Sequence, residues 1–201
     1  MKRDVDFWIT VLARGLVALL AGSAILIIPD MMKTILLLPI AVAAAVAGLA
    51  AYGVFDSVLI FISSFMAQTS KVRIALRLQG LIGVTIGLLL LSVVYNRVQL
   101  DWFLTLAALQ ALSAGIGETI VARHTTNPGV SYWNYAAATI AFIFAATYGF
   151  IRIKWAENLT PRGLSWTVYM YLLAFGIAQC LTAARMLYAD RQALPTASSV
   201  R

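Results

Sequence analysis

Long apolar segments alternate with short polar connections along the 201-residue chain. A helix needs about 20 apolar residues to cross a ~30 Å hydrocarbon core, and six segments reach that length. They cover residues 7–28, 36–65, 74–95, 102–121, 135–153 and 164–187. The pattern predicts an all-α membrane protein with six transmembrane helices, in a single domain over residues 1–189 with a polar tail over 190–201.

The first two segments need further interpretation. A basic N-terminus precedes the first, but no clear cleavage site follows it, so we expect a retained helix rather than a secretory signal. Pro29 and Asp30 then mark a connection. The second segment is longer than a perpendicular span requires, so we expect its helix either to tilt or to begin near Pro39.

The composition narrows the function classes. Hydrophobic residues make up 62% of the chain and charged residues 11%, against about 25% charged in a soluble domain. The net charge of +7 is spread thinly, which favours anionic lipid headgroups over nucleic acid as the partner. A lone Cys180 and a lone His124 cannot build a zinc site from His and Cys alone. No catalytic or phosphate-binding motif is present, so we expect no enzyme, cofactor or metal.

Basic residues set the expected orientation. One side of the predicted topology holds nine Lys and Arg residues and the other holds five. Because cytoplasmic loops carry the excess of positive charge, we expect both termini in the cytoplasm. The larger group is Lys2, Arg3, Lys71, Arg73, Arg77, Arg123, Arg185, Arg191 and Arg201, and the smaller is Lys33, Arg97, Arg152, Lys154 and Arg162.

A short motif recurs in the second, fourth and sixth segments. They read AYGVFDSVL (51–59), SAGIGETIV (113–121) and AFGIAQCLT (174–182), which align Gly53/Asp56 with Gly115/Glu118 and Gly176/Gln179. Gly15 and Gly22 in the first segment match Gly80 and Gly87 in the third. A fixed period indicates repeated units. We therefore predict three tandem two-helix hairpins, about 7–67, 72–123 and 133–188.

The glycines of these segments are typical of close helix packing. Gly83 and Gly87 form a GxxxG motif, which serves either internal packing or homodimerisation. We expect helix contacts at all of the repeat glycines and at this motif: Gly15, Gly22, Gly53, Gly80, Gly83, Gly87, Gly115 and Gly176.

Asp56 lies inside an apolar segment, where a carboxylate costs about 2.5–3.5 kcal/mol on insertion scales. Such a group normally has a partner or is protonated. At a rise of 1.5 Å per residue, Arg14 should lie about 10 Å and Asp56 about 12 Å inside the cytoplasmic interface of the membrane. We predict an intramembrane Arg14–Asp56 ion pair, because consecutive helices should pack side by side.

Other polar residues are predicted at a similar depth in the membrane. Together with the ion pair they would form one layer of polar side chains, a predicted tier. Its members are Arg14, Asp56, Arg77, Gln79, Glu118 and Gln179. The tier could be a proton relay or conduit, or it could be a network that fixes helix packing. The small residues beside the polar ones, and the amide in the third copy, favour packing.

Arg14-Gly15, Gly22, Pro29, Asp56, Gln79-Gly80, Gly87 and Glu118 give the chain a resemblance to the HdeD-type acid-resistance membrane proteins. The resemblance implies six helices built from short repeats, a bacterial inner membrane and a link to acid or envelope stress. It implies no established reaction. Two other functions stay open at this point, an accessory subunit of a larger membrane complex or homo-oligomer, and a proton or small-solute conduit.

Overall fold

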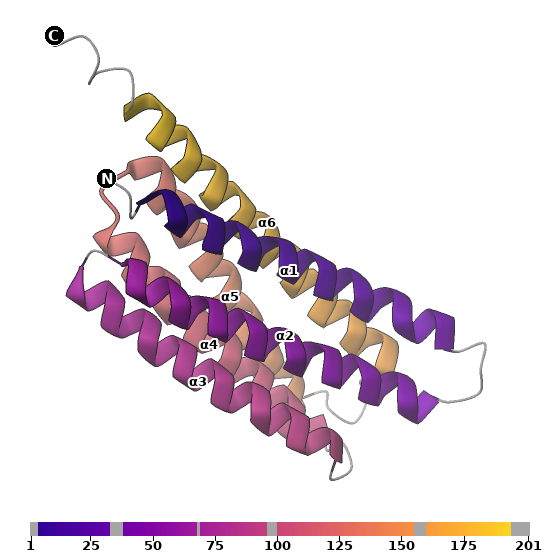
Figure 1. The fold of residues 1–201 in the computed structure, drawn as a ribbon. Coiled ribbons are helices and arrows are strands. Elements are labelled where there is room, and N and C mark those ends of the chain that lie inside the picture. Colours follow the sequence, from indigo (N-terminus) through magenta and orange to yellow (C-terminus); the bar gives the residue numbers. More distant parts are fainter. Residues whose placement is uncertain (1–3, 33–37, 68, 96–99, 155–159, 194–201) are drawn as a thin grey trace, which may run out of the picture.

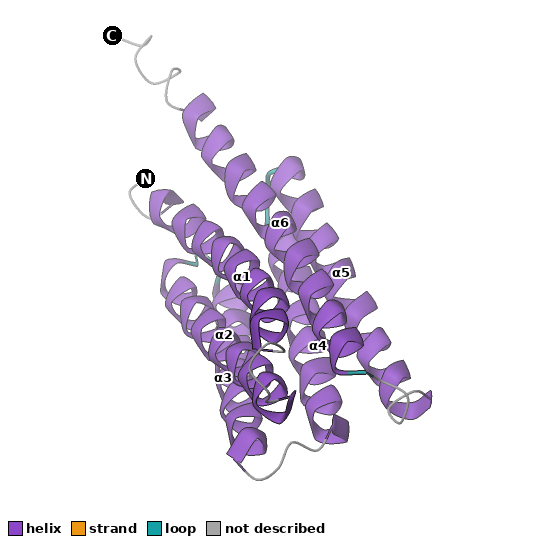
Figure 2. Cartoon of the chain, turned by 90° about the vertical axis from the view of Figure 1, so that its right-hand side faces the viewer, coloured by secondary structure: helices purple, strands orange, loops and turns teal. Residues whose placement is uncertain are grey.

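A computed structural model describes residues 4–32, 38–67, 69–95, 100–154 and 160–193. The described residues form six helices and no strand (Figures 1 and 2). Each helix contains a stretch long and apolar enough to cross a membrane, which confirms the predicted six-helix membrane fold. The helices are α1 (Asp4–Met32), α2 (Leu38–Met66), α3 (Ser70–Tyr95), α4 (Leu100–His124), α5 (Pro128–Lys154) and α6 (Pro161–Ala193).

Polar side chains and prolines define where two helices begin. The Asn127 side chain accepts hydrogen bonds from the backbone N–H of Gly129 (2.9 Å) and Val130 (3.3 Å) at the start of α5. Thr160 accepts one from Gly163 at the start of α6. A proline follows each of these caps at the first helical position, where its missing N–H costs nothing. Pro39 likewise lies in the first turn of α2, so the helix begins close to it.

Two predicted boundaries are wrong. Pro29 does not end the first helix, because α1 continues to Met32. A proline removes a single backbone hydrogen bond, and a membrane helix tolerates that loss near its end. Similarly, α6 continues to Ala193, into the segment predicted as a polar tail. Residues 1–3, 33–37, 96–99 and 194–201, with several of the charges used to predict orientation, lie outside the described residues.

The six helices form a closed ring in chain order. Each helix packs on the next, and α6 packs on α1 to close the ring. Figure 1 shows α1 beginning and α6 ending at the same end of the bundle, which we call the terminal end. The most extensive interfaces are α2–α3, α4–α5 and α1–α6. Each of these lies between two predicted hairpins, so the hairpins associate with one another more closely than their own two helices do.

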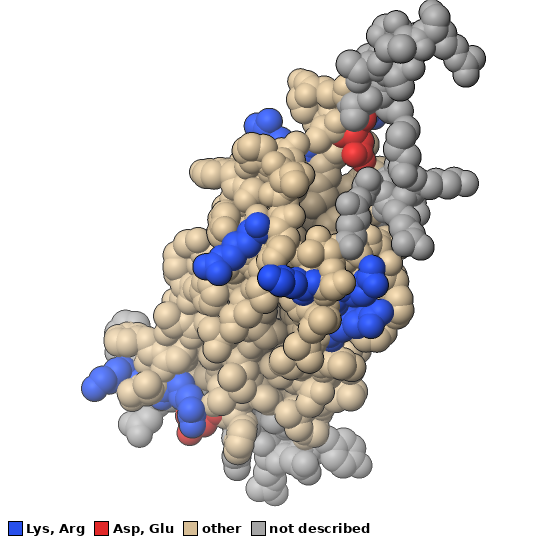
Figure 3. Space-filling model, turned by 90° about the vertical axis from the view of Figure 1, so that its left-hand side faces the viewer, with Lys and Arg blue, Asp and Glu red and all other residues tan. Residues whose placement is uncertain are grey.

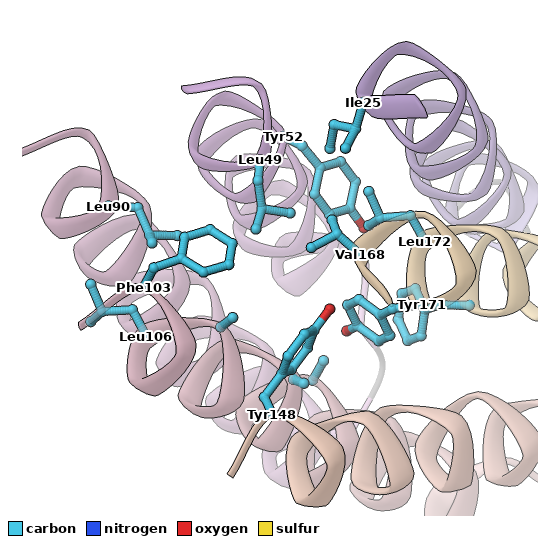
Figure 4. Close-up of a cluster of buried hydrophobic side chains, with 14 of the residues drawn as sticks. Ile25, Leu49, Tyr52, Leu90, Phe103, Leu106, Tyr148, Val168, Tyr171 and Leu172 are labelled. Carbon is cyan, nitrogen blue, oxygen red and sulfur yellow. The ribbon is translucent and has the colours of Figure 1, made fainter. Parts of the chain in front are cut away.

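Apolar side chains cover the outside of the ring and also fill its inside. Leu20 is 70% exposed and Ile153 76% exposed, as lipid-facing residues are. Toward the end opposite the terminal end, a large cluster of buried side chains fills the interior. Figure 4 shows part of it, including Phe103, Tyr148 and Leu172. This half of the bundle is therefore closed by packed side chains.

Close glycine contacts hold the tight interfaces. A Cβ atom on Gly15 would lie 2.9 Å from the carbonyl oxygen of Gly176, and one on Gly83 would collide with the Ser57 hydroxyl. Gly22, Gly80, Gly87 and Gly115 also lie against a neighbouring helix, while Gly53 makes an ordinary contact with Gln110. Gly83 and Gly87 both face α2, so this GxxxG motif serves internal packing.

The glycine contacts also shift the alignment of the first and third helices. Gly15 packs on Cys180, the residue after Gln179, and Gly83 packs on Ser57, the residue after Asp56. Gly83, rather than the predicted Gly80, therefore occupies in the α2–α3 interface the place that Gly15 occupies in the α1–α6 interface.

Candidate functional site

Four polar side chains meet inside the terminal half of the bundle. Arg14 donates from Nε to Asp56 Oδ1 at 2.8 Å and from Nη1 to Glu118 Oε1 at 3.0 Å. Gln179 Nε2 donates to the same Glu118 oxygen at 2.7 Å. We call these four residues the ionic tier. The structure thus confirms the predicted Arg14–Asp56 ion pair and adds Glu118 as a second acceptor.

The ionic tier is shielded from both lipid and bulk solvent. Arg14, Asp56 and Glu118 are each 4% exposed, and Gln179 is fully buried. The residues come from α1, α2, α4 and α6, so the tier connects four of the six helices. Among the described side chains no other ion pair occurs. Inside a membrane an unpaired charge is costly, so these contacts stabilise both the charges and the arrangement of the helices.

Arg77 was predicted in this tier, and that prediction is wrong. Its guanidinium lies 5.1 Å from the centre of the Phe65 ring, in a cation–π contact toward the outside of the bundle. Arg77 and Gln79 are two residues apart, which separates their directions by about 200° around a helix of 3.6 residues per turn. They cannot both face the centre, and it is Gln79 that does.

Gln79 lies at the edge of the ionic tier without joining its hydrogen bonds. Its side chain contacts Gly117, the residue before Glu118, and it is 5% exposed. Neither its Oε1 nor its Nε2 has a hydrogen-bond partner among the described residues. Gln79 therefore carries a larger desolvation cost than Gln179, which pairs its Nε2 and leaves only its Oε1 without a partner.

Replacing each of these two glutamines with methionine should have opposite effects. Gln79→Met keeps the side-chain volume and removes two unpaired polar atoms, so we expect equal or higher stability, by up to about 1–3 kcal/mol. Gln179→Met removes a hydrogen bond to a carboxylate and should cost about 1.5–3 kcal/mol. Unfolding midpoints of the two detergent-solubilised variants, measured against the wild type, give the comparison. A stability loss in Gln79→Met as large as in Gln179→Met would contradict this assignment.

Two tyrosines lie next to the ionic tier on the side away from the terminal end, and a third, Tyr148, packs against one of them. Tyr52 and Tyr171 are close enough to interact electrostatically with Arg14, Asp56 and Glu118. Figure 4 shows the hydroxyl ends of Tyr148 and Tyr171 directed toward each other across the bundle. Sequence reasoning missed these residues, although Tyr52 stands four positions before Asp56 and Tyr171 eight before Gln179, on the same helix faces.

At the terminal end a cavity of about 340 Å³ opens among the helix ends, and we call it the terminal vestibule. Its walls are mainly apolar and its rim is polar, and all six helices and the connection before α5 contribute. Representative residues are Phe7, Val72, Val121, His124, Asn127 and Asp190. Basic residues outnumber acidic ones on the face of the molecule at this end (Figure 3).

No group of three His, Cys, Asp or Glu side chains placed to hold a metal ion occurs within the described ranges. Comparisons of the chain with protein-family models, with curated proteins and with solved structures found no match. The functional interpretation therefore depends on the geometry of the ionic tier and of its surroundings.

Proposed function

We propose that this multi-pass membrane protein is non-enzymatic and takes part in a bacterial response to acid or envelope stress. The observation that carries the proposal is the charge balance of the ionic tier, where two carboxylates share one guanidinium. With all three groups ionised, the tier carries a net charge of −1 in a low-dielectric interior. One bound proton makes it neutral, which is the favourable state there.

Because the ionic tier joins four helices, binding of a proton to it changes the contacts between those helices. Arg14 on α1 bridges Asp56 on α2 and Glu118 on α4, and Gln179 on α6 holds the same Glu118 oxygen. Protonating either carboxylate weakens its attraction to Arg14, and thereby one contact among these helices. The proton count of the tier is therefore coupled to helix packing.

The enclosure of the ionic tier supports a role without catalysis. Its charged groups are engaged with one another and are almost fully buried, so they do not face a cavity that could hold a substrate. The resemblance to HdeD-type proteins supports the stress role and the bacterial inner membrane. The basic residues at the terminal end, such as Arg123 and Arg185, support a cytoplasmic location of that end.

Deleting the gene should lower survival after an acid challenge, and a plasmid copy of the wild type should restore it. The Asp56→Asn/Glu118→Gln double variant keeps similar shapes but cannot exchange a proton, so we expect it to restore survival poorly. Immunoblotting of membranes controls for equal protein levels. Full rescue by the double variant, or unchanged survival on deletion at every cell density tested, would contradict the proposed function.

A further inference from the structure

The terminal vestibule, a layer of apolar side chains and the ionic tier follow one another along the bundle. The apolar layer, which we call the apolar collar, consists of the buried Ile60, Ala67, Val72, Leu76 and Val121 with the partly buried Phe7 packed against them. Four collar residues also line the vestibule, namely Phe7, Ala67, Val72 and Val121, so the collar forms the apolar part of its wall. On α4, Glu118 of the tier is followed by Val121, a collar residue that also lines the vestibule. A spacing of three residues places these two side chains on one helix face.

The same order holds on two further helices. On α3, Gln79, Leu76 and Val72 lead from the edge of the tier through the collar to the vestibule wall. On α2, Asp56 is followed by Ile60 in the collar and by Met66 in the vestibule wall. Val121 lines the vestibule three residues from Glu118, and Val72 lines it seven residues from Gln79. At 1.5 Å per residue, about 5–10 Å therefore separates the vestibule from the tier along these two helices.

The side chains change from polar at the rim of the vestibule to apolar in the collar. His124, Asn127 and Asp190 give the vestibule polar partners for water, and its volume accommodates several water molecules. The His124 ring nitrogen Nδ1 bonds the Ile120 carbonyl oxygen at 2.9 Å, so Nδ1 must carry the hydrogen. The collar itself presents only apolar side chains, and hydrophobic constrictions of this kind restrict water without blocking it permanently.

The bundle is much more firmly closed on the other side of the tier. Leu104 and Leu172 are fully buried and Phe175 is 1% exposed, within a continuous apolar cluster. A void of about 20 Å³ between Tyr52, Gln110 and the two other tyrosines has room for one water molecule at most. A proton on the ionic tier therefore has a short path toward the terminal end and a long, packed one toward the opposite end.

We propose that the ionic tier is a one-sided proton-binding site, which exchanges its proton with water of the terminal vestibule across the apolar collar. This inference rests on the proton-binding role proposed above and assigns its direction. The titratable or charged groups around the tier are Arg14 on α1, Tyr52 and Asp56 on α2, Glu118 and His124 on α4, and Tyr171 and Asp190 on α6. Among the described residues, α3 contributes the buried, uncharged Gln79, and α5 contributes the buried, uncharged Asn134 and the titratable Tyr148, which lies against Tyr171.

The proton itself can be detected with dicyclohexylcarbodiimide, which modifies carboxyl groups that hold a proton in an apolar environment. We expect labelled peptides containing Asp56 or Glu118 by mass spectrometry, and no label at these positions in the Asp56→Asn/Glu118→Gln double variant. Asp101, which is exposed on α4, serves as the internal control and should stay unlabelled. Absence of label on both tier carboxyls at every pH, in protein that remains folded, would overturn the proton-binding site.

Sidedness can be tested with single cysteines in a Cys180→Ala background and a membrane-impermeant thiol reagent on sealed vesicles of both orientations. Val121→Cys should react from the terminal side only, and Leu104→Cys, beyond the tier, from neither side. Reaction of Leu104→Cys from the opposite side would indicate a conduit, and an unreactive Val121→Cys would indicate a dry vestibule. Either result overturns the inference. Unchanged acid survival with this labelling pattern intact would instead contradict only the stress role.

Discussion

Replacing Arg14 with methionine is expected to destabilise the folded protein by about 3–5 kcal/mol, because it leaves the buried acidic pair, Asp56 and Glu118, without its counterion. Asp56 and Glu118 both accept hydrogen bonds from this guanidinium, and neither is exposed enough for water to take its place. Reversible unfolding in mixed micelles, followed by circular dichroism, measures the loss. The loss should shrink as the pH falls, because protonated carboxyl groups need no counterion.

A triple variant separates charge from packing in this experiment. Arg14→Met combined with Asp56→Asn and Glu118→Gln removes all three charges while keeping similar side-chain volumes. Buried ion pairs contribute little net stability compared with apolar or neutral replacements, so we expect the triple variant to recover most of what the single variant loses. If the triple variant is as unstable as Arg14→Met alone, the guanidinium stabilises the bundle by its shape rather than by its charge.

Gly15→Ala is the second substitution from which we expect a large effect. The added Cβ would lie 2.7 Å from the Cys180 sulfur and 2.9 Å from the Gly176 carbonyl oxygen. The carbonyl belongs to the α6 backbone and cannot rotate away, so α1 and α6 must separate. Overpacking of this kind costs about 1–3 kcal/mol. The separation also draws Gln179 away from Glu118, which adds to the loss.

The chain offers a matched control for this substitution. Gly149 in α5 has no atom within 4 Å of the place where its Cβ would be. Gly149→Ala should therefore be neutral, or stabilising by up to about 1 kcal/mol from helix propensity. Thermal denaturation of both alanine variants in the same detergent gives the comparison. Equal midpoints for Gly15→Ala and Gly149→Ala would show that the α1–α6 crossing is not close-packed in the membrane protein.

Much of this fold could be predicted from the sequence, because hydropathy reports directly on membrane spans. The depth of a residue in the membrane could also be predicted, because the fixed rise per residue of a helix places Arg14 and Asp56 at a similar depth. Direction around a helix separates residues that depth alone groups together. Arg77 and Gln79 have similar depths but point to different sides, and only Gln79 turns inward. The tyrosines next to the tier, such as Tyr52, could have been found by the same count of helical positions.

The arrangement of the helices was harder to predict. Sequence repeats indicate which segments resemble one another, but they do not say which neighbouring helices pack most closely. The close packing of Gly15 on Gly176 joins residues at opposite ends of the chain, and no local pattern connects them. The same holds for Gln179, whose partner Glu118 is on another predicted hairpin.

The closure of the ring by α1 and α6 sets an order of events during synthesis. About 130 residues separate the end of α1 from the start of α6, which at 5–20 residues per second means about 6–26 s of translation. During that interval the glycine face of α1 has reached the membrane while Gly176 and Gln179 have not yet been made. Some other surface, either lipid or a membrane chaperone, must cover this face until the last helix arrives. The newly made protein is therefore most vulnerable to misassembly just before its final helix is inserted.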